Sequence, residues 1–180
     1  MSSLGHALRE DATDDSGALA GQTVVLRPTE PRHAEELLAI LREPEVARWW
    51  PDYDLDRVRR ELLGQQRFVV EAFRETVGLI MFDEEDDPQY RHAGIDVFLA
   101  GRVHGQGLGA DAVRTLARHL FTDRGHHRIA IDPAADNVRA IRSYERVGFR
   151  RVGLLREYER GPDGTWHDGL LMDLLVGELS

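Results

Sequence analysis

The stretch that decides the fold is Val103–Ala110, which reads V-H-G-Q-G-L-G-A. Its three glycines, Gly105, Gly107 and Gly109, lead directly into an amphipathic run at Asp111–Phe121. Glycine allows positive φ and leaves the backbone N–H groups uncovered. The start of a helix adds unpaired N–H donors and about half a positive charge. The stretch therefore predicts a binding site for a phosphate or diphosphate, although short glycine-rich turns also serve tight packing.

The composition is that of an ordinary globular chain. Its 180 residues are enough for one domain with a substantial core, and 42% of them are hydrophobic. The absence of cysteine excludes disulfides, thiolate metal sites and a cysteine nucleophile. A formal net charge of −9 disfavours nucleic acid as the main partner and favours a cationic one. Because the sequence has neither an apolar signal segment nor a run of roughly 20 apolar residues, we expect a cytoplasmic protein with no membrane partner.

Hydrophobic periodicity and turn signals divide the chain into alternating elements. Residues 1–22 are polar and aperiodic, so we expect a flexible tail followed by one domain at 23–180. The expected elements are strand Thr23–Arg27, a helix from Pro31 to near Pro44, a loop or short helix at Glu45–Asp54, a helix from Asp54 to Gly64, strands Arg67–Phe73, Thr76–Phe82 and Ala93–Ala100, helix Asp111–Phe121, strand Arg128–Asp132, helix Asn137–Val147, and strands Phe149–Glu159 and Thr165–Val176. This order predicts an α/β fold in which helices cover both faces of a mixed sheet.

The run Asp83–Asp87 contains five consecutive carboxylates and is followed by Pro88. We expect a loop there, because neither a helix nor a strand favours so many like charges in a row. Most charge runs are simply solvated. This one directly precedes the strand that carries Asp96, where it would attract a polycation. Glu84, Glu85 and Asp86 are therefore candidate substrate-binding residues.

Together with a second motif, the glycine-rich stretch resembles the GNAT superfamily of acetyl-CoA-dependent N-acetyltransferases. The family's diphosphate motif, Gln/Arg-x-x-Gly-x-Gly/Ala, is matched at 104–109 except at its first position, where this chain has His104. The second motif is matched at the family's spacing by Asn137, Ala140, Tyr144, Gly148 and Phe149. The resemblance covers about Thr23 to Leu179. It implies a mixed, mostly antiparallel sheet that is splayed at its centre, and acetyl-CoA as co-substrate.

The resemblance also implies which residues hold coenzyme A. Backbone amides near Phe98 and Leu99 would hold the pantetheine arm and polarise the acetyl carbonyl. Asn137 would touch the same arm, and its alternative role as a helix N-cap is compatible with that contact. The remaining cofactor-binding residues implied in this way are His104, Gly105, Gln106, Gly107, Leu108, Gly109, Ala110, Ala140 and Tyr144.

Acetyl transfer from a thioester to an amine requires a neutral amine and a means of stabilising the departing thiolate. Asp96 interrupts the apolar strand Ile95–Leu99, where an aspartate is costly if it is buried without a partner. Its alternatives are a solvent-facing or turn-capping position, whereas the resemblance implies that it meets the substrate amine as a base. On composition alone, Tyr144 is a core residue. The resemblance makes its hydroxyl the general acid toward the coenzyme sulfur.

Within the superfamily, the chain is most similar to the aminoglycoside 6′-N-acetyltransferases. The shared features are Asp87-Pro88, Gly94-Ile95-Asp96, Leu99-Ala100, Asp132-Pro133 and the run from Asn137 to Glu145. The resemblance makes Asp132 a second carboxylate for the substrate's ammonium groups, and a turn or N-cap role is its alternative. Trp49, Trp50 and Phe82 are candidates for stacking on sugar rings or ammonium groups, and core packing is the alternative for each.

We therefore expect an antibiotic-resistance enzyme that acetylates the 6′-amine of aminoglycosides and acts as a monomer or homodimer. None of the eight histidines has metal-ligand spacing, so we expect no metal. One alternative is an N-acetyltransferase for protein N-termini of the ribosomal-protein type, which the sequence Gly164-x-Trp166-x-Asp168 resembles, or for the lysine of a siderophore. Another is a non-catalytic acyl-CoA-binding sensor, which would need neither Asp96 nor Tyr144.

Overall fold

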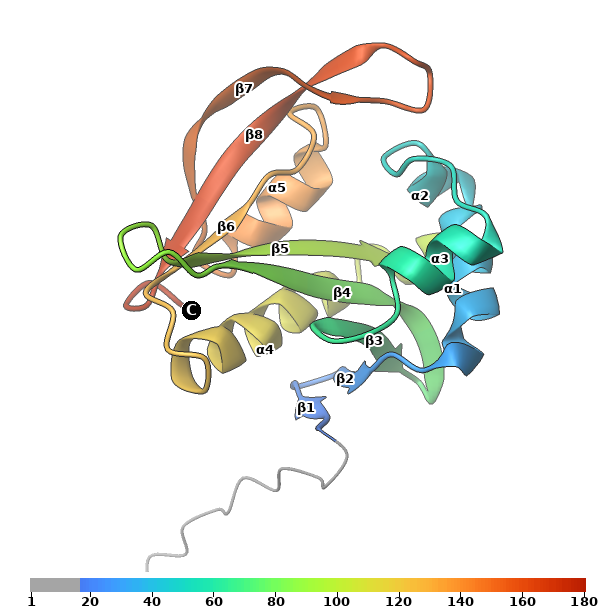
Figure 1. The fold of residues 1–180 in the computed structure, drawn as a ribbon, viewed down its shortest axis with the longest axis horizontal. Helices are drawn as coiled ribbons and strands as arrows, with labels where there is room; N and C mark the ends of the chain where they lie inside the picture. The colour runs from blue at the N-terminus through green and yellow to red at the C-terminus, as the bar shows by residue number, and fades with distance from the viewer. Residues whose placement is uncertain (1–16) are drawn as a thin grey trace, which may run out of the picture.

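A mixed sheet runs through the computed structural model, which describes residues 17–180 (Figure 1). In this part of the chain the sheet has eight strands in the order β1-β2-β3-β4-β5-β6-β8-β7. The strands are β1 (Leu19–Ala20), β2 (Val25–Pro28), β3 (Arg67–Ala72), β4 (Glu75–Glu85), β5 (His92–Leu99), β6 (Arg128–Ile131), β7 (Arg150–Arg160) and β8 (Trp166–Leu175). The helices are η1 (Pro31–His33), α1 (Ala34–Leu41), α2 (Pro44–Ala47), α3 (Leu55–Glu61), η2 (Gly101–Val103), α4 (Leu108–Thr122) and α5 (Val138–Glu145).

Helices cover both faces of the sheet, as the sequence predicts. On one face α1 packs against β4 and α3, and on the other α4 packs against β1, β2, β5 and β6, with α5 beside it (Figure 1). The predicted apolar stripe of α1 is buried at Ala34, Leu37, Leu38 and Leu41. In α4 the buried stripe includes Leu116 and Leu120. The order of elements is therefore the one expected, with β1 and two short 3₁₀ turns in addition. The segment predicted as a loop or short helix begins with the short helix α2.

The sheet splays between β5 and β6. These strands are parallel neighbours, whereas every other strand pair in residues 17–180 is antiparallel. They pair only at Ala93 with Ile129 and at Gly94 with Ala130, and then diverge. The rest of β5 therefore has no strand partner on that side, and its exposed backbone edge is free to bind a ligand. This confirms the expected mostly antiparallel sheet that is splayed at its centre.

The segment that we expected to be a flexible tail is partly ordered. Residues 1–16 lie outside the described part of the chain, but β1 pairs with β2, and a buried carboxylate holds the backbone that follows. Asp111, in the first turn of α4, accepts hydrogen bonds from the backbone nitrogens of Gln22, Thr23 and Val24 at 3.1, 2.7 and 3.1 Å. The expectation of a tail is therefore wrong for 19–22, because a residue 88 positions away from Thr23 holds this segment.

The acidic run is not a loop. Strand β4 continues through Asp83, Glu84 and Glu85, and only Asp86 and Asp87 lie in the turn that follows. Alternation along the strand sends neighbouring carboxylates to opposite faces, where the first two meet cations. Asp83 lies 2.9 Å from Arg67, and Glu84 lies 2.6 Å from Arg124. The expected loop at 83–87 is therefore wrong for 83–85, since pairing with these arginines offsets the repulsion.

No helix within residues 17–180 combines the length and the apolar character that crossing a bilayer would require.

Candidate active site

A pocket opens beside the glycine-rich stretch, where β5 ends and α4 begins. Gly105 and Gly107 have φ of +79° and +82°, and a Cβ added to either would meet nothing within 4 Å. These glycines therefore serve the backbone conformation and an open surface, not tight packing. Gly107, in the left-handed conformation, is the N-cap of α4 and supplies no side-chain cap. The first N–H groups of the helix, which have no partner within it, therefore stay available to a ligand. These features fit a diphosphate bound to backbone amides.

Most of the predicted cofactor residues line this pocket. They are Phe98, Leu99, His104, Gly105, Gly107, Leu108, Gly109, Asn137, Ala140 and Tyr144. Gln106 and Ala110 do not line it. The side-chain amide of Gln106 turns away and donates to the carbonyl of Arg102 at 3.1 Å. Ala110 is buried in the first turn of α4, directly after Gly109. For these two residues, binding of coenzyme A through the backbone amides stays a prediction.

A second pocket, which we call the acceptor cleft, adjoins the first. Trp49, Trp50, Val97, Asn137 and Tyr144 line both pockets and form the wall between them. Asp96 and Asp132 line the acceptor cleft alone. A thioester held in the first pocket and an amine held in the second would meet at this shared wall.

Asp96 sits in the middle of β5, opposite Met81 of β4. Its carboxylate keeps contact with solvent, but the walls of the cleft surround it on most sides. This burial, followed by the negative charges of Asp132 and Asp83, raises the pKa of Asp96 to about 6. A base with a pKa just below neutral is largely ionised at physiological pH and still holds a proton well. Asp96 is thus suited to accept a proton from an ammonium group.

Tyr144 projects from α5 into the same region and is buried. Burial, and then the negative charges of Asp96 and Asp132, raise the pKa of its hydroxyl above the ordinary value. The hydroxyl therefore keeps its proton at neutral pH and can donate it to a developing anion. Asn137 begins the same helix, and its side chain accepts from the backbone nitrogen of Ala140 at 3.2 Å. Its N-cap role and its place in both pockets hold together, as the sequence allowed.

Trp49 and Trp50 follow α2 and remain partly exposed, so they are not simply core residues. The ring of Trp50 meets Phe98 edge-on, with centroids 4.9 Å apart. The guanidinium of Arg48 lies 4.4 Å from the ring centroid of Trp49. Each indole thus has one fixed neighbour and also borders the acceptor cleft, where an aromatic face can stack on a sugar ring or an ammonium group.

Phe82 and Glu84 lie on the opposite face of the sheet from Asp96. Strand alternation places Asp96 beside Met81, and it places Phe82 and Glu84 toward α4. Phe82 is 3% exposed and packs between Phe68 and His119. The substrate-binding role expected for Phe82 is therefore wrong, because this side chain belongs to the core.

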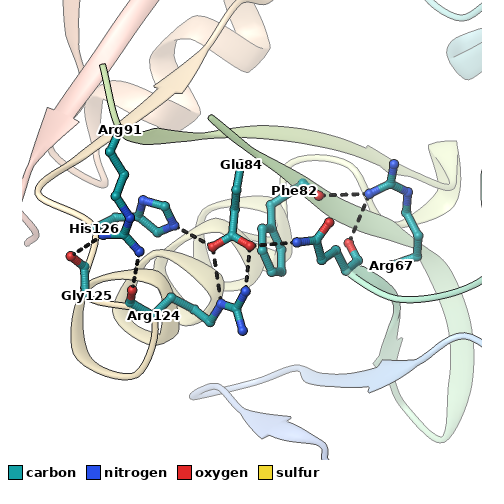
Figure 2. A network of polar contacts seen from close by, with 8 residues as sticks. Arg67, Phe82, Glu84, Arg91, Arg124, Gly125 and His126 are labelled. Atoms are coloured by element: carbon teal, nitrogen blue, oxygen red, sulfur yellow. Dashed lines mark hydrogen bonds and ion pairs between the residues drawn. The ribbon is translucent and has the colours of Figure 1, made fainter. Parts of the chain in front are cut away.

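The buried carboxylate of Glu84 is the centre of a network of polar contacts (Figure 2). Its carboxylate accepts hydrogen bonds from Arg124 at 2.6 Å and from Gln66 at 2.7 Å, and it lies 2.6 Å from Nε2 of His126. The hydrogen bond from Arg124 is the main reason that the pKa of Glu84 falls to about 2. This carboxylate is already satisfied by protein donors, so the expectation that it binds substrate is wrong. Glu85 and Asp86 are exposed, but neither lines the acceptor cleft.

Strand β7 contributes two site residues that the sequence did not reveal. An irregularity between Leu155 and Glu159 breaks the regular pairing of β7 with β8. At its centre, Glu157 has a φ of +48°, and its backbone nitrogen donates to Asp168 at 2.8 Å. The bulge brings Tyr158 within hydrogen-bonding reach of Asp132 and brings Glu159 to the wall of the cleft. A regular strand was expected here, and alternation gives no sign of a bulge.

The cleft thus gathers three carboxylates, those of Asp96, Asp132 and Glu159. Burial and then the charge of Asp132 raise the pKa of Glu159, while the hydrogen bond to Asp132 raises the pKa of Tyr158 to about 12. No arginine or histidine is among the described residues that line this cleft. Within residues 17–180, no three histidine or carboxylate side chains come close enough together to hold a metal ion.

Comparison with known proteins identifies the family. A family profile described as "Acetyltransferase (GNAT) domain" matches residues 23–150. The chain belongs to the GNAT acetyltransferase family. Over 84 residues this GNAT protein is 44% identical to the aminoglycoside N(6′)-acetyltransferase type 1 of Klebsiella pneumoniae. That match covers 46% of this chain but 39% of the relative, so the chain spans about two fifths of the relative's length. The kanamycin resistance protein of Rhizobium radiobacter is also 44% identical over 84 residues, which are 72% of its length.

Two solved structures extend the similarity over most of the chain. The aminoglycoside acetyltransferase AAC(6′)-Ib, in complex with ribostamycin and coenzyme A, is 26% identical with a TM-score of 0.71, covering 87% of this chain and 96% of that one. Mycobacterium smegmatis RimJ, in complex with CoA-disulfide, is 28% identical with a TM-score of 0.76, covering 91% of this chain and 88% of that one. Both neighbours bind a form of coenzyme A, and one also binds an aminoglycoside.

Proposed function

We propose that this GNAT acetyltransferase transfers the acetyl group of acetyl-CoA directly to the 6′-amine of an aminoglycoside, and so gives its host resistance to these antibiotics. One observation carries the proposal: the acceptor cleft gathers Asp96, Asp132 and Glu159, and no described lining residue is basic. Such a cleft attracts a small molecule with several ammonium groups and disfavours anionic acceptors. The partial similarity to two aminoglycoside-related proteins supports the same substrate class.

The residues of the site have complementary roles in this reaction. Acetyl-CoA, when bound, supplies the thioester. Asp96 takes a proton from the 6′-ammonium, and the neutral amine then forms the new N–C bond while the C–S bond breaks. Tyr144 gives its proton to the departing sulfur, and the nitrogen loses its second proton to solvent. Asp132 and Glu159 hold further ammonium groups of the acceptor, and amides near Leu99 polarise the acetyl carbonyl.

The substrate class is tested by measuring thiol release from acetyl-CoA with a panel of acceptors. A kanamycin-type aminoglycoside is compared with basic peptides that carry a free N-terminus. Turnover by the Asp96→Asn variant is measured on both acceptors and shows whether the reaction depends on the cleft. We expect turnover of the aminoglycoside at least 100-fold above that of the peptides, because only the former places several ammonium groups within one cleft. Turnover on peptides but not on aminoglycosides would contradict the proposal.

Acetylation of a protein N-terminus is the second candidate. It is favoured by the 28% identity with RimJ over 91% of the chain. A third pocket shares Trp49, Pro51, Ala134 and Glu159 with the acceptor cleft and continues it toward His167 of β8. That extension offers room for an extended peptide as well as for further sugar rings, so the peptides of the panel decide between the two candidates.

A further inference from the structure

His104 connects the glycine-rich stretch to α5 through both of its ring nitrogens. Nε2 lies 2.8 Å from the carbonyl oxygen of Leu99, and Nδ1 lies 2.6 Å from Nη1 of Arg139. A carbonyl can only accept a hydrogen bond and a guanidinium can only donate one. From these two partners we infer that Nε2 carries the hydrogen and donates it to the Leu99 carbonyl, while Nδ1 accepts a hydrogen bond from Arg139. The ring therefore links the end of β5 to the guanidinium of Arg139.

Arg139 faces the cofactor pocket and has no carboxylate partner in residues 17–180. It is exposed and lines that pocket, and its guanidinium hydrogen-bonds to the ring of His104. Arg67, Arg124 and Arg128 pair with carboxylates, whereas Arg139 and Arg146 line the cofactor pocket without an ion pair to any described residue. Of these two, Arg139 is the one whose guanidinium contacts a side chain of the glycine-rich stretch. A guanidinium that points into a pocket and keeps its charge uncompensated, in a chain with a net charge of −9, indicates an anionic ligand.

We propose that Arg139, oriented by His104, binds the diphosphate of coenzyme A. This side-chain contact supplements the backbone amides of Gly105 to Gly109, because His104 next to Gly105 holds the guanidinium at the edge of the same amide surface. In this chain, His104 acts as a positioning residue and Arg139 acts as the binding residue. The inference rests on the proposed function only in taking acetyl-CoA as the acetyl donor.

The test is calorimetric binding of three probes: coenzyme A, 3′-dephospho-coenzyme A and pantetheine. The variants are Arg139→Ala, Arg139→Gln, His104→Ala and the double variant. Arg142→Ala is the matched control, because Arg142 is an exposed arginine on the same helix that does not line the pocket. Thermal unfolding of each variant confirms that it is folded, and Arg139→Gln keeps the long side chain if alanine perturbs α5.

We expect both Arg139 variants to weaken coenzyme A and 3′-dephospho-coenzyme A equally, by roughly 10- to 100-fold, as for loss of a charge-assisted contact. Pantetheine binding and the Arg142→Ala control should stay within about twofold of wild type. His104→Ala should weaken coenzyme A similarly, and the double variant should be no weaker than Arg139→Ala, because the histidine acts through the arginine.

Five results would overturn the inference. Unchanged coenzyme A binding by Arg139→Ala would remove Arg139 from the site. A loss seen with coenzyme A but not with the 3′-dephospho form would move Arg139 to the 3′-phosphate. An equal loss with pantetheine would indicate a general structural effect. Additive losses from the two single substitutions would remove the positioning role of His104. Failure of the wild-type protein to bind coenzyme A at all would overturn the proposed function as well, so the two failures are distinguishable.

Discussion

Asp96 of β5 and Tyr144 of α5 face one cleft, and the negative charge of Asp96 adds to burial in raising the pKa of the Tyr144 hydroxyl. The two groups thus have complementary roles: one is suited to accept a proton and the other to donate one. The carboxylate, with a pKa of about 6, is ready to take a proton, whereas the phenol keeps its own until an anion develops nearby.

Asp96→Asn should lower kcat by roughly 10²- to 10⁴-fold, because the amide cannot accept the proton of the acceptor's ammonium group. The affinity for acetyl-CoA, measured by calorimetry, should stay near the wild-type value, since Asp96 does not line the cofactor pocket. Glu85→Gln is the control, because Glu85 is an exposed carboxylate of β4 that lines neither pocket. Near wild-type turnover by Asp96→Asn would show that Asp96 is not the base.

The pH dependence of kcat/KM should follow the ionisation of Asp96. The ionised form is the active one, so activity should rise with pH and level off above a midpoint near 6. Because the charge of Asp132 helps to raise the pKa of Asp96, Asp132→Asn should move that midpoint to lower pH. Asp136→Asn, which alters a carboxylate outside this cleft, should leave the midpoint in place. A midpoint that is unmoved by Asp132→Asn would disprove the coupling.

Tyr144→Phe should lower kcat by roughly 100-fold while the protein stays folded, because the ring is kept and only the proton donor is lost. Single-turnover measurements separate this effect from binding. If kcat is unchanged and the KM for acetyl-CoA rises, the hydroxyl is a binding group and not the acid.

Glu84→Ala should destabilise the fold by roughly 1–3 kcal/mol, because it leaves the donors of Arg124, Gln66 and His126 without their shared acceptor. The pKa of Glu84 is depressed to about 2, so its stabilising contribution is present above an unfolded value near 4.5 and is lost as the pH falls toward 2. The difference in unfolding free energy between wild type and variant should shrink over that range. Glu85→Ala, at an exposed neighbour, is the control; an equal effect there would argue against the network.

Local patterns predicted most of the fold. The stripe of α1, the glycine-to-helix junction at α4 and the N-cap Asn137 all rest on residues near each other in sequence, where periodicity and capping are informative. The prediction of a loop at 83–87 failed because the sequence shows the density of charge but not which side chain pairs with each carboxylate. The charge of Asp83 is compensated by Arg67, and the charge of Glu84 is compensated by Arg124, which lies 40 residues away in the sequence.

The site residues likewise fall into those that local sequence predicts and those that depend on contacts distant in the sequence. Asp96 and Asp132 could be selected from sequence because each interrupts or ends an apolar strand. Glu159 and Tyr158 could not, since a bulge at Glu157, held by Asp168 of another strand, determines where they point. Phe82 and Glu84 were misplaced for a related reason: they are close to Asp96 along the hairpin but lie on the other face of the sheet. The pairing of His104 with Arg139 spans 35 residues and likewise has no local sign.

The most direct test of the central claim uses two aminoglycosides that are identical except at the 6′ position, one with an amine and one with a hydroxyl. Thiol release from acetyl-CoA is measured with each, and the acetyl group on the product is located by NMR. Our account predicts efficient turnover of the amine with acetyl on the 6′-nitrogen, and no turnover of the hydroxyl compound above background. Equal turnover of both, or acetylation at another nitrogen, would contradict it.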